Sequence, residues 1–298
     1  MYDISIILPT IRTHLLEDLY NSICKSCDRH SFELICVGPF DIPKSLSKLD
    51  NIKYIKDYGS PTRCMQIALT NAKGTLIHPL VDDCFYYPKT LSTTINIFNH
   101  DCKQNDILGM RFFENPEHYK AIKEKKTTEQ QPELRNKCHP DAYWYAGPSY
   151  GYLRGVNPNW GAACLFIANT NLIKDFGGWD CQFEYINHAT HDLLFRLQKY
   201  GSHFLLTQYD CFVADWKAEG DPPGTATDHA PIHYGQLTHD IPLFQNIWQY
   251  PNNRGKIQLN NWENTPTKWT RRFVQGQPIN YDEMIKKYSQ EDNYGQKI

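Results

Sequence analysis

The 298-residue sequence has no long hydrophobic run and no excess of charge of one sign. Its apolar runs, such as Ile4-Ser5-Ile6-Ile7-Leu8, are far shorter than the ~20 residues of a membrane-spanning helix, so we expect no transmembrane segment. The 31 Lys and Arg residues against 33 Asp and Glu residues give a net charge of −2, which argues against nucleic-acid binding. No basic stretch followed by a long apolar one stands near Met1, so we expect no signal peptide and a cytoplasmic location. Basic and aromatic residues at 268–273 leave peripheral membrane association open.

Closely spaced cysteine pairs are scarce as well. Of the ten cysteines, Cys24 and Cys27 form the one close pair, three residues apart within an expected helix. A zinc or redox site usually needs a second such pair, or a cysteine at the start of a helix. Reduced thiols are also the usual state in a chain without a signal peptide. We therefore expect free cysteines without a metal or redox role.

What the sequence does contain, over its first 115 residues, is an alternation of strand and helix patterns. Strands are expected at residues 4–8, 32–37, 52–55, 75–81 and 106–113, and helices at residues 15–23, 62–71 and 88–99. This alternation predicts an α/β fold with a mostly parallel sheet flanked by helices. Pro79 predicts a local irregularity in its strand, because proline cannot donate a ladder hydrogen bond.

The second half of the chain has a weaker pattern. A strand at 162–168, a short helix at 171–176 and a helix at 191–200 closed by Gly201 are expected there. After Trp216 the sequence becomes rich in Pro, Asn, Gln and Trp. We therefore predict one domain over 1–215 and a C-terminal extension over 216–298 that packs on or over the active site.

Two adjacent acids follow the expected strand at 75–81, in Leu80-Val81-Asp82-Asp83. In open α/β sheets, ligands bind outside the carboxyl ends of the strands. Two neighbouring carboxylates there are costly unless a cation or hydrogen-bond donors compensate them, and Mg²⁺ or Mn²⁺ is a natural partner. Capping of the following turn would explain one of the acids equally well.

Asp192 is the second candidate, in Thr190-His191-Asp192-Leu193-Leu194. We expect it in the first turn of the helix at 191–200. The helix dipole favours an acid there whatever the function of the protein, so position alone does not assign a role to Asp192.

Several segments resemble those of family 2 glycosyltransferases of the GT-A fold. The segments Ile4–Thr10, Gly59–Arg63 and Ala72–Gly74 leading into Val81-Asp82-Asp83 are similar to the nucleotide-sugar half of that family. The segments Asn159–Ala163, Phe176–Asp180 and His191–Leu197 are similar to its acceptor half. The match covers roughly the first 215 residues in the family's order, and serial motifs are more specific than single ones. The resemblance implies a Rossmann-like GT-A sheet, with the nucleotide-sugar half over 1–100 and the acceptor half over 101–215.

The resemblance also implies an activity and its principal residues. The chain would be a metal-dependent, inverting hexosyltransferase that moves a sugar from a nucleoside-diphosphate sugar to a glycan hydroxyl. Asp83 would hold Mn²⁺ or Mg²⁺ on the donor diphosphate, where the metal stabilises the leaving group. Asp82 would contact the ribose or sugar hydroxyls, and Asp192 would be the general base on the acceptor hydroxyl.

Further residues follow from the same resemblance. Pro9, Thr10 and Arg12 would border the nucleotide, and Arg63 would meet the phosphates. No acid stands directly after the second strand, so Asp41 or Asp57 would have to recognise the base; a UDP-sugar is favoured and a GDP-sugar is possible. The acceptor residues would be Trp160, Trp179, Asp180 and His191, although aromatic residues in that region could equally serve packing. His229 or His233 would be a third metal ligand, although Pro231 between them argues for a loop.

Two other functions remain open because the motifs depart from the family pattern at Gly38, Val81 and His191. A catalytically inactive, glycosyltransferase-like module would bind a glycan without turnover and without need of Asp192. A sugar-nucleotidyltransferase would use a similar sheet and acidic site. That class usually carries a glycine-rich phosphate loop after the first strand, and Pro9-Thr10-Ile11-Arg12-Thr13 contains no glycine.

Overall fold

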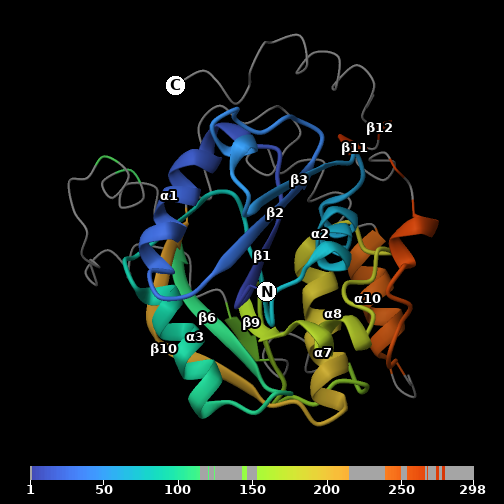
Figure 1. The fold of residues 1–298 in the computed structure, drawn as a ribbon. Coiled ribbons are helices and arrows are strands. Elements are labelled where there is room, and N and C mark those ends of the chain that lie inside the picture. The colour runs from blue at the N-terminus through green and yellow to red at the C-terminus, as the bar shows by residue number, and fades with distance from the viewer. Residues whose placement is uncertain are drawn as a thin grey trace.

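The structure is a computed structural model that describes residues 2–114, 120, 124, 143–145, 153–214, 239–249, 254–265, 267, 273–274 and 277–278. Figure 1 shows a mixed α/β body in which helices flank a central sheet. None of the helices within the described residues is long and apolar enough to cross a membrane. The predicted α/β class with a mostly parallel sheet is confirmed.

The central sheet has eight strands in the order β3-β2-β1-β4-β9-β6-β10-β5. Its strands are β1 (Ile4–Pro9), β2 (Phe32–Gly38), β3 (Ile52–Lys56), β4 (Leu76–Pro79), β5 (Cys84–Tyr86), β6 (Ile107–Glu114), β9 (Phe166–Asn169) and β10 (Phe204–Ala214). β9 and β5 run antiparallel to their neighbours, and the remaining strands share one direction. Small two-stranded sheets pair β7 (Tyr143–Tyr145) with β8 (Gly161–Ala163), and β11 (Phe273–Val274) with β12 (Gln277–Pro278).

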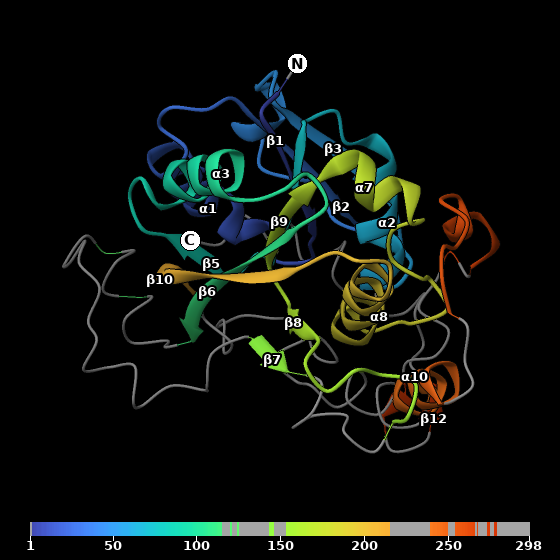
Figure 2. The same ribbon diagram turned by 90° about the horizontal axis from the view of Figure 1, so that it is seen from below.

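The helices cover both faces of the sheet, as Figures 1 and 2 show. They are α1 (Leu16–Ser26), α2 (Pro61–Asn71), α3 (Thr90–Asp101), α7 (Thr170–Asp175), α8 (Ile186–Lys199) and α10 (Ile241–Trp248). Ile4, Ile6 and Leu8 of β1 face the core formed with α1 and α3, whereas Ile7 faces the core formed with α2 and α8. This alternation is what the period of two residues in a strand requires when both faces are covered.

The point where the chain reverses direction across the sheet lies at β1. From β1 the chain continues to β2 and β3 on one side, and then returns to β4 on the other side of β1. β1 pairs in parallel with both β2 and β4, so the carboxyl ends of β1 and β4 lie together. Ligands in open α/β sheets bind at such a position, which makes it the first place to look for a site.

Three element predictions are wrong in their bounds. The strand expected at 162–168 is two strands, β8 and β9, in different sheets; the chain bends at Cys164, whose thiol donates to Asn187. The helix expected at 191–200 begins at Ile186. The strand expected at 75–81 ends at Pro79, so the missing N–H group falls at the end of the ladder.

The expected C-terminal extension contains a helix that the sequence reading missed, α10. Its buried residues Phe244, Ile247 and Trp248 belong to the same core as α2 and α8. This part of the extension is therefore core structure, while the division of the chain at 215/216 stays a prediction.

Two buried histidines predict acid sensitivity. Burial lowers the pKa of His78 to about 4, and burial together with the nearby His188 lowers that of His191 to about 3. Unfolding restores an ordinary pKa near 6.5, so full stability is expected above that pH. As the pH falls from there towards 4, each buried histidine should reduce the free energy of unfolding by about 1.4 kcal/mol per pH unit.

Urea unfolding at a series of pH values measures this effect. His78→Asn should flatten the acid slope, whereas His100→Gln, at an exposed position of α3, should leave it unchanged. An equal decrease of the free energy of unfolding with falling pH in the wild-type protein and in His78→Asn would show that His78 does not cause the acid sensitivity.

Candidate active site

The acidic pair lies at the carboxyl ends of β4 and β1, where the fold predicts a ligand. Oδ2 of Asp82 accepts hydrogen bonds from the Thr10 hydroxyl (2.7 Å) and from the backbone N–H groups of Arg12 (3.1 Å) and Ile11 (3.3 Å). Oδ1 accepts one from Nε of Arg12 (2.7 Å) and also pairs with Nη2 of that residue. The turn after β1 therefore holds both oxygens of Asp82.

Arg12 joins the two acids. While Nε and Nη2 bind Asp82, Nη1 donates to Oδ2 of Asp83 at 3.0 Å, and all three side chains are buried. Burial alone raises the pKa of Asp82, but Arg12 and the hydrogen bond from Thr10 lower it, and the net direction is downward. The compensating cation that two adjacent carboxylates require is thus supplied by the chain itself.

This arrangement does not fit the expected divalent metal. At nucleotide sites a cation such as Mg²⁺ is held by one or two carboxylates together with phosphate oxygens and waters, so it needs carboxylate oxygens that are not already bound to protein donors. The oxygens of Asp82 point to protein donors, and within the described residues no group of three or more His, Cys, Asp or Glu side chains is placed to hold a metal ion. His229 and His233 lie outside the described residues, so their expected role stays a prediction.

Two of the other expected donor residues, Asp57 and Arg63, form a second cluster, at the start of α2. Nε and Nη2 of Arg63 pair with the carboxylate of Asp57, with Nη2–Oδ2 at 3.0 Å. Arg63 also donates to the backbone carbonyl of Trp262, and its guanidinium carbon lies 5.1 Å from the centre of that ring. Asp41, by contrast, is a surface residue paired with Lys56 (3.4 Å), and Pro9 ends β1. Of the two acids predicted to recognise a base, the structure therefore places Asp57, not Asp41, beside Arg63.

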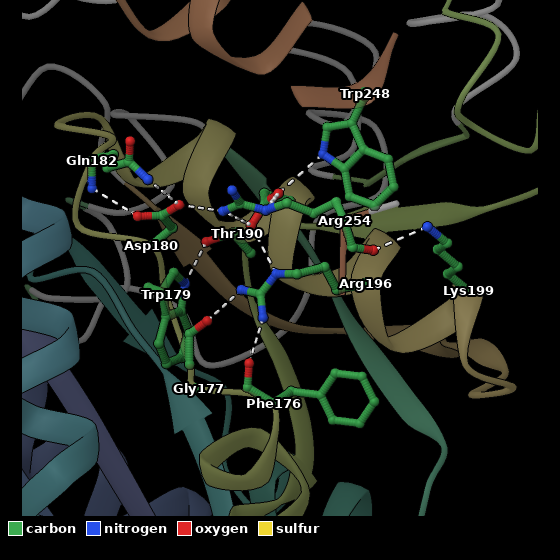
Figure 3. A network of polar contacts seen from close by, with 12 residues as sticks. Phe176, Gly177, Trp179, Asp180, Gln182, Thr190, Arg196, Lys199, Trp248 and Arg254 are labelled. Carbon is green, nitrogen blue, oxygen red and sulfur yellow. Dashed lines mark hydrogen bonds and ion pairs between the residues drawn. The ribbon is translucent and has the colours of Figure 1, made fainter. Parts of the chain in front are cut away.

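Asp192 is the centre of a buried ion-pair network. Figure 3 labels its partners Arg196, Trp248 and Arg254. Oδ1 accepts a hydrogen bond from the indole N–H of Trp248 (3.0 Å) and forms an ion pair with Nε of Arg254 (3.0 Å). Oδ2 accepts hydrogen bonds from Nε of Arg196 (2.9 Å) and Nη2 of Arg254 (3.2 Å). The side chain of Asp192 is 0% exposed. The carboxylate is thus surrounded by donors from α8, α10 and the segment after it.

The expected place of Asp192 in a first helical turn is wrong. Because α8 begins at Ile186, Asp192 lies in its second turn, and two arginines stabilise its charge. A general base needs a lone pair within reach of the substrate hydroxyl. Both oxygens of Asp192 have protein donors here, so its role as the base stays a prediction that requires Arg254 to move.

The expected acceptor residues surround this network. Asp180 forms an ion pair with Arg254, and Trp179 is fully buried with its indole N–H on Thr190 (2.9 Å; Figure 3). His191 is buried too, whereas Trp160 is partly exposed and packs edge-on against Trp248. The structure brings Asp180 and Asp192 together through Arg254, and it places Trp179 and His191 in the core.

Residues 254–265, here called the C-terminal strap, run between the Asp192 network and the Asp57–Arg63 cluster. At one end, Arg254 binds Asp180 and Asp192. At the other end, Trp262 covers Arg63. The strap thus contacts residues expected at the acceptor site and residues expected at the donor site.

Backbone contacts hold the middle of the strap. The N–H group of Ile257 donates to the carbonyl of Phe176 (3.2 Å), and the side chain of Asn261 accepts from the N–H group of Cys181 (2.9 Å). At Gly177, φ is +85° and a Cβ atom would lie 2.1 Å from the carbonyl oxygen of Ile257. Only glycine permits both that backbone conformation and that close approach.

The contacts of Trp248 and Arg254 with Asp192 are not predicted from the sequence, although a packing role of Trp248 in the extension is one expectation from it. Two sequence features indicate the helix that carries Trp248. Asp240 and Pro242 are residue types typical of a helix start, and Phe244 and Trp248 are four residues apart, which is the spacing of a buried helix face. Arg254 offered no comparable signal, because a single arginine in a polar segment has no periodic context.

Comparisons with known proteins give only distant structural likeness. No family model and no curated protein sequence matches the chain. Solved structures of Staphylococcus aureus TarS are similar at 14–15% identity. TarS 1–349 in complex with UDP-GlcNAc has a TM-score of 0.49, and the match covers 88% of this chain and 69% of that one. TarS 1–349 in complex with UDP has a TM-score of 0.46, and that match covers 74% of this chain and 61% of the TarS chain. A further TarS structure has a TM-score of 0.47, and that match covers 80% of this chain and 40% of the TarS chain. The present chain therefore spans less than two thirds of those two TarS chains.

Proposed function

We propose that the chain is a glycosyltransferase that transfers a sugar from a nucleoside-diphosphate sugar to a glycan hydroxyl. The observation that carries this proposal is the position of Thr10, Arg12, Asp82 and Asp83 at the carboxyl ends of β1 and β4, where the strand order reverses. Open α/β sheets bind nucleotides at that position. The reaction class comes from the resemblance of the sequence motifs to glycosyltransferases. The motifs that end at Thr10 and Asp83 lie at the same edge of the sheet.

The second cluster supports a nucleotide at the same edge. Asp57 follows β3 and Arg63 lies in the first turn of α2, at the same carboxyl edge of the sheet, with β2 between β3 and β1. An arginine fixed by a carboxylate is suited to meet phosphate or base oxygens in a defined orientation. On this proposal Asp57 recognises the nucleotide, and Arg63 meets the phosphates once Trp262 has moved away from its guanidinium group. A UDP-sugar is the favoured donor.

Donor binding tests the proposal. We expect one member of a panel of UDP-, GDP- and TDP-sugars to raise the melting temperature and to be slowly hydrolysed. Asp83→Asn should weaken its binding by about tenfold, because it removes the charged partner that holds Nη1 of Arg12 in place. Asp101→Asn, at the exposed end of α3, is the matched control and should bind like the wild-type protein. Absence of binding and of hydrolysis for every donor would overturn the proposal.

One observation favours the non-catalytic alternative, namely the full set of donors on Asp192. A glycan-binding module needs no general base, so this network could be purely structural there. Such a module would bind a glycan array without nucleotide, and Asp83→Asn would not change that binding. A transferase would instead release nucleoside diphosphate in proportion to glycan product.

A further inference from the structure

The buried carboxylates of Asp82 and Asp83 have a protein cation beside them, the guanidinium group of Arg12. Asp82 and Asp83 are 2% and 8% exposed, and Arg12, at 6%, lies between them. Two buried carboxylates side by side repel each other unless a positive charge compensates them. A divalent metal is one such charge, and a guanidinium group is another.

One carboxylate oxygen of each acid points to the guanidinium group of Arg12. Oδ1 of Asp82 faces Nε (2.7 Å) and Oδ2 of Asp83 faces Nη1 (3.0 Å) of the same guanidinium. The other oxygen of Asp82 is held by the turn after β1, through Thr10 and backbone N–H groups. A metal ion that bridged Oδ1 of Asp82 and Oδ2 of Asp83 would displace the guanidinium and leave it buried beside a second cation, which Coulomb repulsion opposes.

We propose that Arg12 takes the place of a divalent cation at the Asp82–Asp83 pair, so that the nucleotide site works without metal. The identity of the ligand as a nucleotide rests on the proposed function, whereas the position of Arg12 between the two carboxylates does not. A guanidinium group keeps its charge at every pH at which the protein is folded, and its planar shape suits phosphate oxygens. On the proposed function, the ligand is the diphosphate of the sugar nucleotide, bound at the edge of the sheet that carries this pair in the absence of Mg²⁺ and Mn²⁺.

Metal binding to the wild-type protein is the first test, with Mn²⁺ alone as the probe. Electron paramagnetic resonance and calorimetry should give the same number of bound Mn²⁺ ions for the wild-type protein and for Asp83→Asn. Nucleotide affinity should agree within about twofold in EDTA and in Mn²⁺, a difference of about 0.4 kcal/mol. Mn²⁺ bound by the wild-type protein and lost in Asp83→Asn would overturn the proposal.

Removal of the guanidinium is the second test. Arg12→Gln should create a Mn²⁺ site, because it leaves two carboxylates without their cation. Its nucleotide affinity should fall by about tenfold or more in EDTA, the effect expected for a lost charged hydrogen bond, and recover in part when Mn²⁺ is added. Arg29→Gln, an exposed arginine, is the matched control, and circular dichroism checks that each variant is folded. A folded Arg12→Gln protein that gains no Mn²⁺ site would also overturn the proposal.

The two proposals fail in different ways. A protein that binds no nucleotide in either EDTA or Mn²⁺ contradicts the glycosyltransferase function. The Mn²⁺ titrations without nucleotide decide the role of Arg12 in either case, and they need only the wild-type chain and Asp83→Asn if Arg12→Gln does not fold.

Discussion

Asp192→Ala should lower the free energy of unfolding by about 3–5 kcal/mol, because removal of one partner leaves buried charges uncompensated. The substitution removes the carboxylate that Arg196, Arg254 and Trp248 all contact. Arg196 is itself fully buried, and burial lowers its pKa, so in the variant its positive charge would lie in the core without the carboxylate that compensates it. Urea unfolding, followed by circular dichroism, measures the loss.

The control for this prediction is Asp175→Ala, because Asp175 is exposed at the end of α7 and should change stability by less than about 0.5 kcal/mol. A double substitution that also changes Arg254→Met should cost less than the two single changes added together, since the two residues share one interaction. Asp192→Ala with unchanged stability and abolished sugar transfer would contradict the structural role and would favour Asp192 as the base.

Trp248→Ala should be nearly as damaging as the loss of Asp192. The side chain of Trp248 is fully buried and packs against Phe195, Phe244 and Trp160, so its truncation leaves a large cavity. Large aromatic residues replaced by alanine in a core typically cost about 3–5 kcal/mol. The melting temperature and the urea midpoint of the purified variant measure this cost.

Trp248→Phe separates packing from hydrogen bonding. Phenylalanine keeps most of the apolar volume but removes the N–H group that donates to Asp192 (3.0 Å), so we expect a loss of about 1.5–3 kcal/mol. Leu205→Ala, at a position that is 39% exposed, is the control and should cost little. Equal losses for Trp248→Phe and Trp248→Ala would show that the hydrogen bond, not the packing, carries the effect.

The first half of the fold could be predicted because its elements have strong local signals. The run Ile4–Leu8 and the helix beginning near Leu15 are long periodic patterns, and Asp82 and Asp83 directly follow a buried strand. The contact between Arg12 and these acids could not be predicted, because it joins residues 70 and 71 positions apart. Local patterns carry no information about such a pairing.

The second half was harder to predict, for reasons that lie in its buried polar residues. His188, Thr190 and His191 are buried in the first half of α8, and this polar stretch hides the start of the helix at Ile186. Helix starts are usually recognised from a capping residue before an apolar pattern. Here Tyr185 stands before the helix without a side-chain cap, so that signal is missing.

The order of synthesis gives the C-terminal strap a further consequence. Asp180 and Asp192 leave the ribosome well before Trp248 and Arg254, which stabilise their carboxylates. During that interval, among the residues that the structure describes, Asp192 has Arg196 as a cationic partner but still lacks Arg254. Domains generally fold as units once their elements are available. The half of the core around α8 is therefore expected to reach its final packing only after residues 241–265 have emerged, so stalled or shortened chains will need chaperones.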